Sequence, residues 1–339
     1  MKIIKNIEGR NLNNNNIYRN ISELLQQARK NVNKAVNSAM VYTYFEIGRI
    51  IVEEEQEGKK RASYGKELIK NLAEKLTQEF GKGFSVRNIE QMRKFYSVYS
   101  KTQKVSAEFK LSWSHYIKLC RINNIDERDF YEIEAINNNW SLKELSRHFD
   151  TGLYERLLLS RDKEEVRKLS SHGQIIEKPK DIIKDPYVLE FLGLESLPKY
   201  SESTLENAII DHVEKFIMEL GKGFLFQGRQ VKFTFDEEHF FVDLVFYNRI
   251  LKCFVVIDLK IGKLKHQDIG QMQMYVNYYD RYVKLDDENK TIGIIICKDK
   301  NDTLIEITLP ENNEQIFASK YITVLPSKDE LKKIVEDES

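Results

Sequence analysis

The sequence has few of the residues that mark specialised classes of protein. Its 339 residues include only 5 Pro, 15 Gly and 3 Cys, which excludes collagen-like and mucin-like chains and a disulfide-stabilised scaffold. No apolar run approaches the roughly 18 residues of a membrane-spanning helix. The first residues also lack the apolar stretch of a secretion signal. We therefore expect a globular cytoplasmic protein that does not enter the membrane.

The formal net charge of the chain is also zero, yet its two halves carry net charges of opposite sign. Residues 1–150 contain 26 basic and 19 acidic residues, whereas residues 151–339 contain 27 and 34. The basic excess is concentrated in residues 82–121, which hold nine basic and two acidic residues. This basic window is a candidate for binding a polyanion. A solvated helical surface is the alternative interpretation.

The spacing of apolar residues predicts two domains joined by a linker. An asparagine-rich stretch over residues 1–16 is expected to be a disordered tail. Apolar spacings of three and four predict an all-helical domain over residues 17–158. Residues 159–199 contain three of the five prolines and are predicted to be the linker. Residues 200–327 predict an α/β domain with a mixed sheet, followed by a charged tail over residues 328–339.

Within the α/β domain, short runs rich in β-branched and aromatic residues predict the strands. These runs are Phe224–Phe226, Gln230–Phe235, Phe240–Tyr247, Cys253–Ile261, Thr291–Cys297 and Tyr321–Leu325. A helix precedes the first strand, and another follows the fourth over Gln267–Tyr279.

The segment from residue 84 to residue 95 has the outline of the second helix of a helix-turn-helix. Ser85 has the chemistry of an N-cap, and Ile89, Met92 and Phe95 fall on one inward stripe. Arginine, asparagine and glutamine pair with the edges of guanine and adenine, and side chains near the start of such a helix face the major groove. Packing between helices is the alternative. The residues that we expect to contact nucleic acid are Arg87, Asn88, Gln91, Arg93 and Lys94.

Two neighbouring predicted strands each place an acidic residue inside an apolar run. These residues are Asp243 and Asp258, and Lys260 shares the face of Asp258 because side chains alternate along a strand. A carboxylate inside an apolar strand is costly unless it is paired or binds a cation. Two carboxylates and a lysine are the groups that metal-dependent phosphodiester hydrolysis uses. An exposed ion pair between Asp258 and Lys260 on an edge strand is the alternative.

The arrangement resembles the PD-(D/E)xK nucleases, whose signature is an acid on one strand and (D/E)-x-K on the next. Glu206, on the preceding helix, and the Q-x-x-x-Y pair of Gln271 and Tyr275 match further features of that superfamily. Longer runs over about residues 17–325 are similar to its YhcG-like group, among them DPYVLEFLGL from Asp185 and GFSVRNIEQMRKFYSVY from Gly83. The sequence departs from the pattern at Asn248, where His is expected.

The resemblance implies a restriction-endonuclease-like fold for the C-terminal domain and a role for each matched residue. Lys260 would orient the attacking water or stabilise charge, and Gln271 and Tyr275 would support that lysine and contact nucleic acid. The implied cofactor is Mg²⁺, for which Mn²⁺ substitutes. Its implied ligands are Asp243, Asp258 and Glu206.

From the residues and the resemblance together we expect a metal-dependent endonuclease that cuts nucleic acid, with double-stranded DNA as its substrate and the helical domain as its DNA-binding part. Two alternatives keep the same residues: a nucleic-acid-binding or assembly module that does not cut, and a nuclease that acts on RNA. A homodimer is a further expectation, because cutting both strands of a duplex commonly uses two sites.

Overall fold

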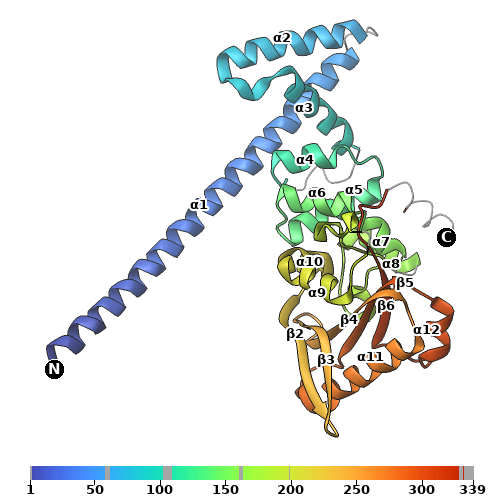
Figure 1. The fold of residues 1–339 in the computed structure, drawn as a ribbon. Helices are drawn as coiled ribbons and strands as arrows, with labels where there is room; N and C mark the ends of the chain where they lie inside the picture. Colours follow the sequence, from blue (N-terminus) through green and yellow to red (C-terminus); the bar gives the residue numbers. More distant parts are fainter. Residues whose placement is uncertain are drawn as a thin grey trace. The chain divides into compact units, whose positions relative to one another are not determined.

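The computed structural model of the protein describes residues 2–57, 62–101, 109–159, 163–197 and 199–327, together with Leu331. The chain divides into two compact units (Figure 1). Unit 1 takes in residues 1–128 and 135–142, and unit 2 takes in residues 129–134 and 143–339. No helix among the described residues has the length and apolarity needed to cross a bilayer.

Unit 1 is built from helices, as the sequence predicts. Its elements are α1 (Lys2–Glu57), α2 (Ala62–Phe80), η1 (Lys82–Phe84), α3 (Val86–Tyr99) and α4 (Trp113–Leu119), and it shares α5 (Ile125–Asn137) with unit 2. The Ser85 hydroxyl accepts a hydrogen bond from the Asn88 backbone N–H, which confirms the predicted N-cap of α3. Gly48 lets α1 approach α3, because a Cβ there would clash with the carbonyl oxygen of Met92.

Helix α1 is longer than the sequence predicts. The structure continues this helix back to Lys2, across the residues expected to form a disordered tail. Asparagine costs a helix at most about 0.7 kcal/mol per residue relative to alanine, and helical residues satisfy one another's backbone hydrogen bonds. The asparagine run is therefore compatible with a helix that begins before it.

Unit 2 contains a six-stranded mixed sheet, which confirms the predicted α/β class. The strand order is β1-β6-β5-β4-β3-β2; the pairs from β1 to β4 are parallel, and β4, β3 and β2 are antiparallel. The strands are β1 (Tyr187–Val188), β2 (Phe224–Phe235), β3 (Glu238–Asn248), β4 (Cys253–Lys263), β5 (Ile292–Asp299) and β6 (Ile316–Ile322). Strand β6 begins earlier than the predicted Tyr321–Leu325, because its pairing with β5 starts at Ile316.

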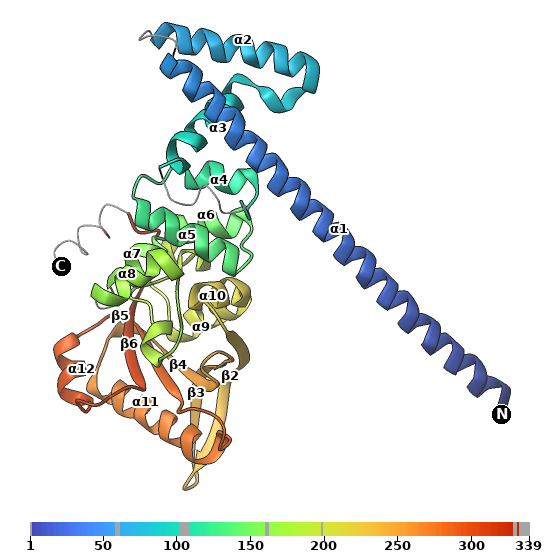
Figure 2. The ribbon, with the colours of Figure 1, turned by 180° about the vertical axis from the view of Figure 1, so that it is seen from behind.

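Helices cover both faces of this sheet (Figures 1 and 2). Leu205 of α9 (Glu202–Asp211) and Phe216 of α10 (Val213–Leu220) join the core on one face. Met272 of α11 (His266–Tyr278) joins the core on the other face, against which α12 (Asp302–Thr308) also packs. Because both faces are covered, the inner strands are almost entirely apolar. An acidic side chain in β4 is therefore an exception that needs a physical reason.

Much of the predicted linker belongs to unit 2. Residues 163–172 form helix α8, and Pro179–Ile182 form the 3₁₀ turn η3. Tyr187 of β1 pairs with Tyr321 of β6 and is fully buried in the core. The prolines interrupt regular structure, but the apolar residues between them still pack. Apart from Leu331, the predicted C-terminal tail lies outside the described residues.

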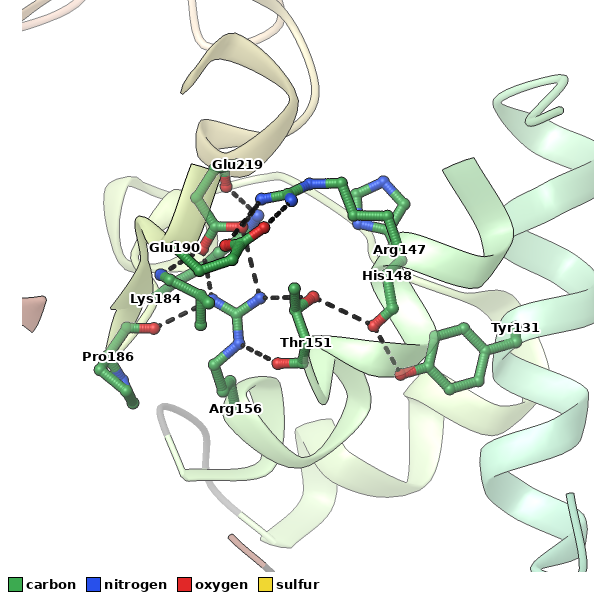
Figure 3. Close-up of polar contacts among 10 residues, drawn as sticks. Tyr131, Arg147, His148, Thr151, Arg156, Lys184, Pro186, Glu190 and Glu219 are labelled. Atoms are coloured by element: carbon green, nitrogen blue, oxygen red, sulfur yellow. Dashed lines mark hydrogen bonds and ion pairs between the residues drawn. The ribbon is translucent and has the colours of Figure 1, made fainter. Parts of the chain in front are cut away.

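Unit 2 also buries a cluster of charged side chains (Figure 3). Arg156 of α7 (Leu153–Leu159) forms an ion pair with Glu219 of α10, and both side chains are almost completely inaccessible. Arg156 also donates to the carbonyl of Pro186 at 2.9 Å, and Lys184 donates to the backbone carbonyl of Glu219. Burial alone would raise the pKa of Glu219, but the charges of Arg156 and Lys184 outweigh it and hold that pKa at about 2. The cluster therefore ties α7, α10 and the segment before β1 together.

Removing the charge of Glu219 should strongly destabilise unit 2. We expect Glu219→Gln to lower the free energy of unfolding by about 3–5 kcal/mol, because the buried Arg156 loses its ion-pair partner and Lys184 loses the negative charge that offsets its own. The measurement is thermal unfolding of the full chain, with hydrogen exchange in α7 and α10 to identify the unit affected. Asp299→Asn, in an exposed pair with Lys320 at 3.9 Å, is the control and should change stability by less than about 1 kcal/mol. Equal effects of the two substitutions would contradict this account.

Candidate active site

Three polar residues lie side by side across β2, β3 and β4. Leu244 of β3 pairs with Ile257 of β4, so the next position along the antiparallel register places Asp243 opposite Asp258. The register between β2 and β3 places Gln230 opposite Asp243 in the same way. The two strand carboxylates that the sequence singles out are therefore brought together.

The Asp258 carboxyl group is buried, and one lysine stands beside it and a second carboxyl group. Asp258 is only 2% exposed. This excludes the alternative interpretation of the sequence, in which Asp258 and Lys260 form an exposed ion pair on an edge strand. Lys260 Nζ lies 2.8 Å from Asp258 Oδ2. Burial and the neighbouring charge of Asp243 nevertheless raise the pKa of Asp258 to about 7, because together they outweigh the opposing effect of Lys260.

Lys260 itself stays cationic. Burial acts to lower the pKa of its ammonium group, but the charge of Asp258 acts in the opposite direction and the net result is a raised pKa. A lysine that holds its proton acts by charge and by hydrogen-bond donation rather than as a general base. Lys260 is thus suited to stabilising negative charge beside the acid pair.

The amide of Gln230 connects the strand acids to Glu206 of α9. Gln230 Nε2 donates to Glu206 Oε2 at 2.7 Å and to Asp243 Oδ1 at 3.0 Å. The second oxygen of Asp243 accepts from the backbone N–H of Leu259 at 2.8 Å. Burial, helped by the charge of Asp243, raises the pKa of Glu206. Glu206 therefore belongs to the same polar cluster as the strand acids, one amide removed from Asp243.

Gln230 is a residue of this cluster that the sequence does not reveal. Its φ is +45°, a left-handed conformation that costs a non-glycine residue roughly 1–2 kcal/mol. Backbone strain of this kind gathers at functional sites. This left-handed conformation depends on the surrounding fold. The sequence, in which Gln230 is one residue of a predicted strand, therefore does not predict it.

Gln271 and Tyr275 of α11 lie on one helix face, as their spacing predicts. Gln271 Nε2 donates to Tyr275 Oη at 2.7 Å, and Tyr275 Oη donates to the carbonyl of Phe241 at 2.8 Å. Burial, together with the charges of Asp258 and Asp243, raises the pKa of Tyr275 well above its ordinary value. The tyrosine is therefore a neutral donor that links α11 to the strand of Asp243.

The candidate nucleic-acid residues of α3 have unequal surroundings. Arg87 and Lys94 are exposed, and Gln91 is half-buried. Arg93 is paired with Glu55 of α1 at 3.1 Å. The first two therefore present their charge to solvent, whereas the charge of Arg93 is partly compensated.

The Asn88 carboxamide is engaged within unit 1. Its Nδ2 donates to the carbonyl of Gly83 at 2.6 Å, and its Oδ1 accepts from Trp113 Nε1 at 2.8 Å. Both ends of the amide thus hold the turn before α3 and the start of α4. The sequence suggests an outward base contact for this residue, but the structure gives it a structural contact.

Asn248, which stands where the family pattern has His, shapes a turn. It is fully buried; its Nδ2 donates to the carbonyl of Lys222 at 3.0 Å, and its Oδ1 accepts from the N–H groups of Ile250 and Leu251. These contacts fix the turn between β3 and β4, and with it the register that opposes the two strand acids.

No three His, Cys, Asp or Glu side chains are grouped closely enough to form a metal cluster within the part of the chain that the structure describes. Mg²⁺ is often held by one or two carboxylates with water and substrate phosphates completing its shell. The Asp243 and Asp258 pair meets that smaller requirement.

Comparison with known proteins shows the class of the C-terminal domain and the family of the whole chain. Residues 180–336 match the model of the YhcG PDDEXK nuclease domain, and residues 20–156 match that of the DUF1016 N-terminal domain. The C-terminal domain is thus of the PD-(D/E)xK class. The chain is also 38% identical over 354 aligned positions to the protein named "Putative nuclease YhcG" from Escherichia coli (strain K12), covering 96% of this chain and 94% of that protein. The chain belongs to the YhcG family of PDDEXK nucleases.

Two solved structures show limited similarity. A repair endonuclease from Pyrococcus abyssi is 19% identical with a TM-score of 0.25, and it covers 36% of this chain. The structure of EndoMS in apo form is 17% identical with a TM-score of 0.24, and it covers 38%. Each similarity spans 48% of the solved chain.

The Tyr275 hydroxyl should contribute to stability, and the hydroxyl of Tyr278 should not. We expect Tyr275→Phe to lower the free energy of unfolding by about 1–2 kcal/mol, because the Phe241 carbonyl and the Gln271 amide lose their partner. Tyr278→Phe is the matched control on the same helix. Thermal unfolding with hydrogen exchange in α11 checks the pair, and an unchanged stability for Tyr275→Phe would count against the linking role.

Proposed function

We propose that the protein is an Mg²⁺-dependent endonuclease that hydrolyses phosphodiester bonds of DNA. The observation that carries the proposal is the buried Asp258 carboxyl group, with Asp243 opposite it on β3 and the Lys260 ammonium 2.8 Å from it. A carboxylate pair of this kind is stabilised by a divalent cation, and Lys260 supplies positive charge beside it. Membership of the YhcG family supports the reaction class.

The donor set fits a hard divalent cation. Carboxylate oxygens are the ligands that Mg²⁺ and Mn²⁺ prefer, and the burial of Asp258 favours a bound cation over two ionised acids side by side. Asp243 and Asp258 would hold the ion. Glu206 would join through a rearrangement of the Gln230 amide, which now lies between it and Asp243. A cation held there supplies Lewis-acid activation of water and of the scissile phosphate.

The protein's own residues would orient the reacting groups. Lys260, which keeps its proton, stabilises the charge that develops on the phosphate oxygens. The backbone N–H of Leu259 and the Gln230 amide fix the two oxygens of Asp243. Tyr275 holds α11 against β3 and so fixes the wall of the site.

Loss of the Asp258 charge should abolish cleavage and spare binding. We expect Asp258→Asn to reduce the cleavage rate about 100-fold or more, and to remove the rise in melting temperature that Mg²⁺ or Mn²⁺ gives the unsubstituted protein. The measurements are cleavage of supercoiled and linear DNA, and separately of RNA, with each metal and with a chelator. Asp299→Asn is the control for a strand carboxylate outside the site.

The outcomes separate the three interpretations of the site. Metal-dependent DNA cleavage that needs Asp258 and Lys260 supports the proposal, whereas cleavage of RNA alone would favour an RNA nuclease. Tight binding without cleavage on every substrate would favour a non-cleaving module. Full activity of Asp258→Asn would remove this residue from the metal site.

Unit 1 is proposed to bind the DNA backbone through the exposed part of α3. Support comes from the basic window over residues 82–121 and from the exposed side chains of Arg87 and Lys94. Gln91 and Arg93 flank them. The Asn88 amide is already engaged, so electrostatic contact with phosphates accounts for binding better than readout of base edges.

Replacing the two exposed basic residues of α3 should weaken binding without changing its sequence preference. We expect Arg87→Ala with Lys94→Ala to reduce DNA affinity and to lower the salt dependence of log K by about 2, because each substitution leaves one phosphate without its neutralising cation. Lys70→Ala with Lys75→Ala, on α2 outside the basic window, is the matched control. An unchanged salt dependence would count against phosphate binding by α3.

A homodimer is proposed to form through the exposed seam of α1. Apolar residues alternate at spacings of three and four, and all are exposed: Tyr18, Ile21, Leu25, Ala28, Val32, Ala35, Ala39 and Tyr42. A repeat of 3.5 residues is the pattern of coiled coils. A second copy presents the same seam, so two copies of the chain bury these apolar residues against each other.

Charge placed in this seam should separate the dimer. We expect the full chain to sediment as a dimer, and Leu25→Asp with Val32→Asp to sediment as a monomer, because buried unpaired charges oppose association. The control is Gln27→Glu with Asn37→Asp, two acidic substitutions outside the seam on the same helix. A monomer before any substitution would overturn the proposal.

The cytoplasmic location expected from the sequence remains part of the proposal. Cys120, Cys253 and Cys297 are buried and none forms a disulfide, which suits a reducing compartment.

A further inference from the structure

A cavity of about 370 Å³ is lined by residues of β2, of α11 and of the turn that follows α11, all of which belong to unit 2 (Figures 1 and 2). Aromatic rings form much of its wall. Phe235 of β2 and Tyr282, in the π-helical turn η6 (Tyr279–Val283), line it and are 58% and 64% exposed. Phe233 and Tyr278 also line it and stack on each other, with ring centroids 4.0 Å apart. The exposed rings of Phe235 and Tyr282 come from different elements, and exposed aromatic rings are groups on which a flat ligand stacks.

The polar groups of this cavity are available to a ligand. Gln273 Nε2 donates to Asn277 Oδ1 at 3.2 Å, which leaves the Gln273 carbonyl oxygen and the Asn277 amide nitrogen without a partner among the described residues. Arg281, also in the lining, has no ion pair in that part of the chain. An acceptor, an amide donor and a guanidinium beside aromatic faces match the hydrogen-bonding edge of a nucleobase and its phosphate.

The ring of Phe233 lies between a residue of the cavity and a residue of the candidate active site. Phe233 contacts Tyr275 edge-on, with ring centroids 5.8 Å apart, and stacks on Tyr278 on its other side. Gln271, Tyr275 and Tyr278 occupy successive turns of one face of α11. A strand whose phosphate reaches Asp243 and Asp258 and that continues along β2 meets this cavity roughly 10–16 Å further on, because Phe233 and Phe235 lie three and five strand positions beyond Gln230.

We infer that the cavity takes a nucleobase unstacked from the strand that is cut, so that the preferred substrate has unpaired bases a few nucleotides from the scissile phosphate. Base pairing and stacking hold a base inside a fully paired duplex, and withdrawing it costs a few kcal/mol, whereas a single-stranded stretch offers it freely. This inference rests on the proposed nuclease function and narrows its substrate to DNA with single-stranded segments.

The test uses the full chain carrying Asp258→Asn, so that bound DNA is not cut. The probe is an oligonucleotide with a single-stranded extension in which one base is the fluorescent analogue 2-aminopurine, whose emission falls when it stacks on aromatic rings. We expect quenching on binding. Tyr282→Ala or Phe235→Ala should remove the quenching and lower affinity about tenfold. Tyr282→Phe should retain both, because stacking does not need the hydroxyl group.

Leu285→Ala, a residue 65% exposed that does not line the cavity, is the matched control and should leave quenching and affinity unchanged. Equal affinity and quenching in the alanine variants would overturn the inference, as would equal affinity for a fully paired duplex and for the single-stranded extension. If the unsubstituted chain cuts no nucleic acid with Mg²⁺ or Mn²⁺, the nuclease proposal fails by itself. The quenching readout, which needs no cleavage, still decides on the cavity.

Discussion

The pairing of β3 with β4 forces two like charges together, and most contacts of the candidate active site follow from that constraint. Asp243 and Asp258 are brought opposite each other where Asp258 is nearly inaccessible to water. Repulsion between carboxylates is strong where water is excluded. The Lys260 ammonium, the backbone N–H of Leu259 and the Gln230 amide each offset part of it. The remaining deficit of positive charge is what a divalent cation would supply.

Two buried acids in unit 2 show how the surroundings separate a structural role from a chemical one. Glu219 lies among Arg156 and Lys184, so its pKa falls to about 2 and its charge is permanent. Asp258 has one cation and a second acid beside it, so its pKa rises to about 7. The first cluster is internally complete and joins helices. The second cluster has one cation for two acids, a charge balance that a bound metal ion would improve.

Helix α11 contributes residues both to the candidate active site and to the aromatic cavity. Its inward residues fill the core against the sheet, while Gln271 and Tyr275 reach the strand of Asp243. The neighbouring flank lines the aromatic cavity beyond Phe233. One helix therefore carries residues of both the candidate active site and the cavity, so a nucleotide held in the cavity would have a defined position relative to the acid pair.

Local periodicity let the sequence predict the helical first unit, the mixed sheet of the second, and the pairing of Asp258 with Lys260 on one face. The α3 cap at Ser85 and the shared face of Gln271 and Tyr275 were predictable for the same reason. Each of these features depends on residues within a few positions of one another. The amino-acid pattern by itself therefore determined the class of each unit, most of the helices and strands, and the two strand acids.

Only the tertiary structure decided what depends on distant parts of the chain. The pairing of β1 with β6 joins residues more than a hundred positions apart and turns much of a predicted linker into core. The left-handed backbone of Gln230 and its bridge from Glu206 to Asp243 arise where α9 and two strands meet. The Asn88 amide is drawn into contact with Trp113. The spacing of residues along a sequence predicts which face of a helix or strand a side chain occupies. The residues that this side chain contacts depend on how the whole unit packs.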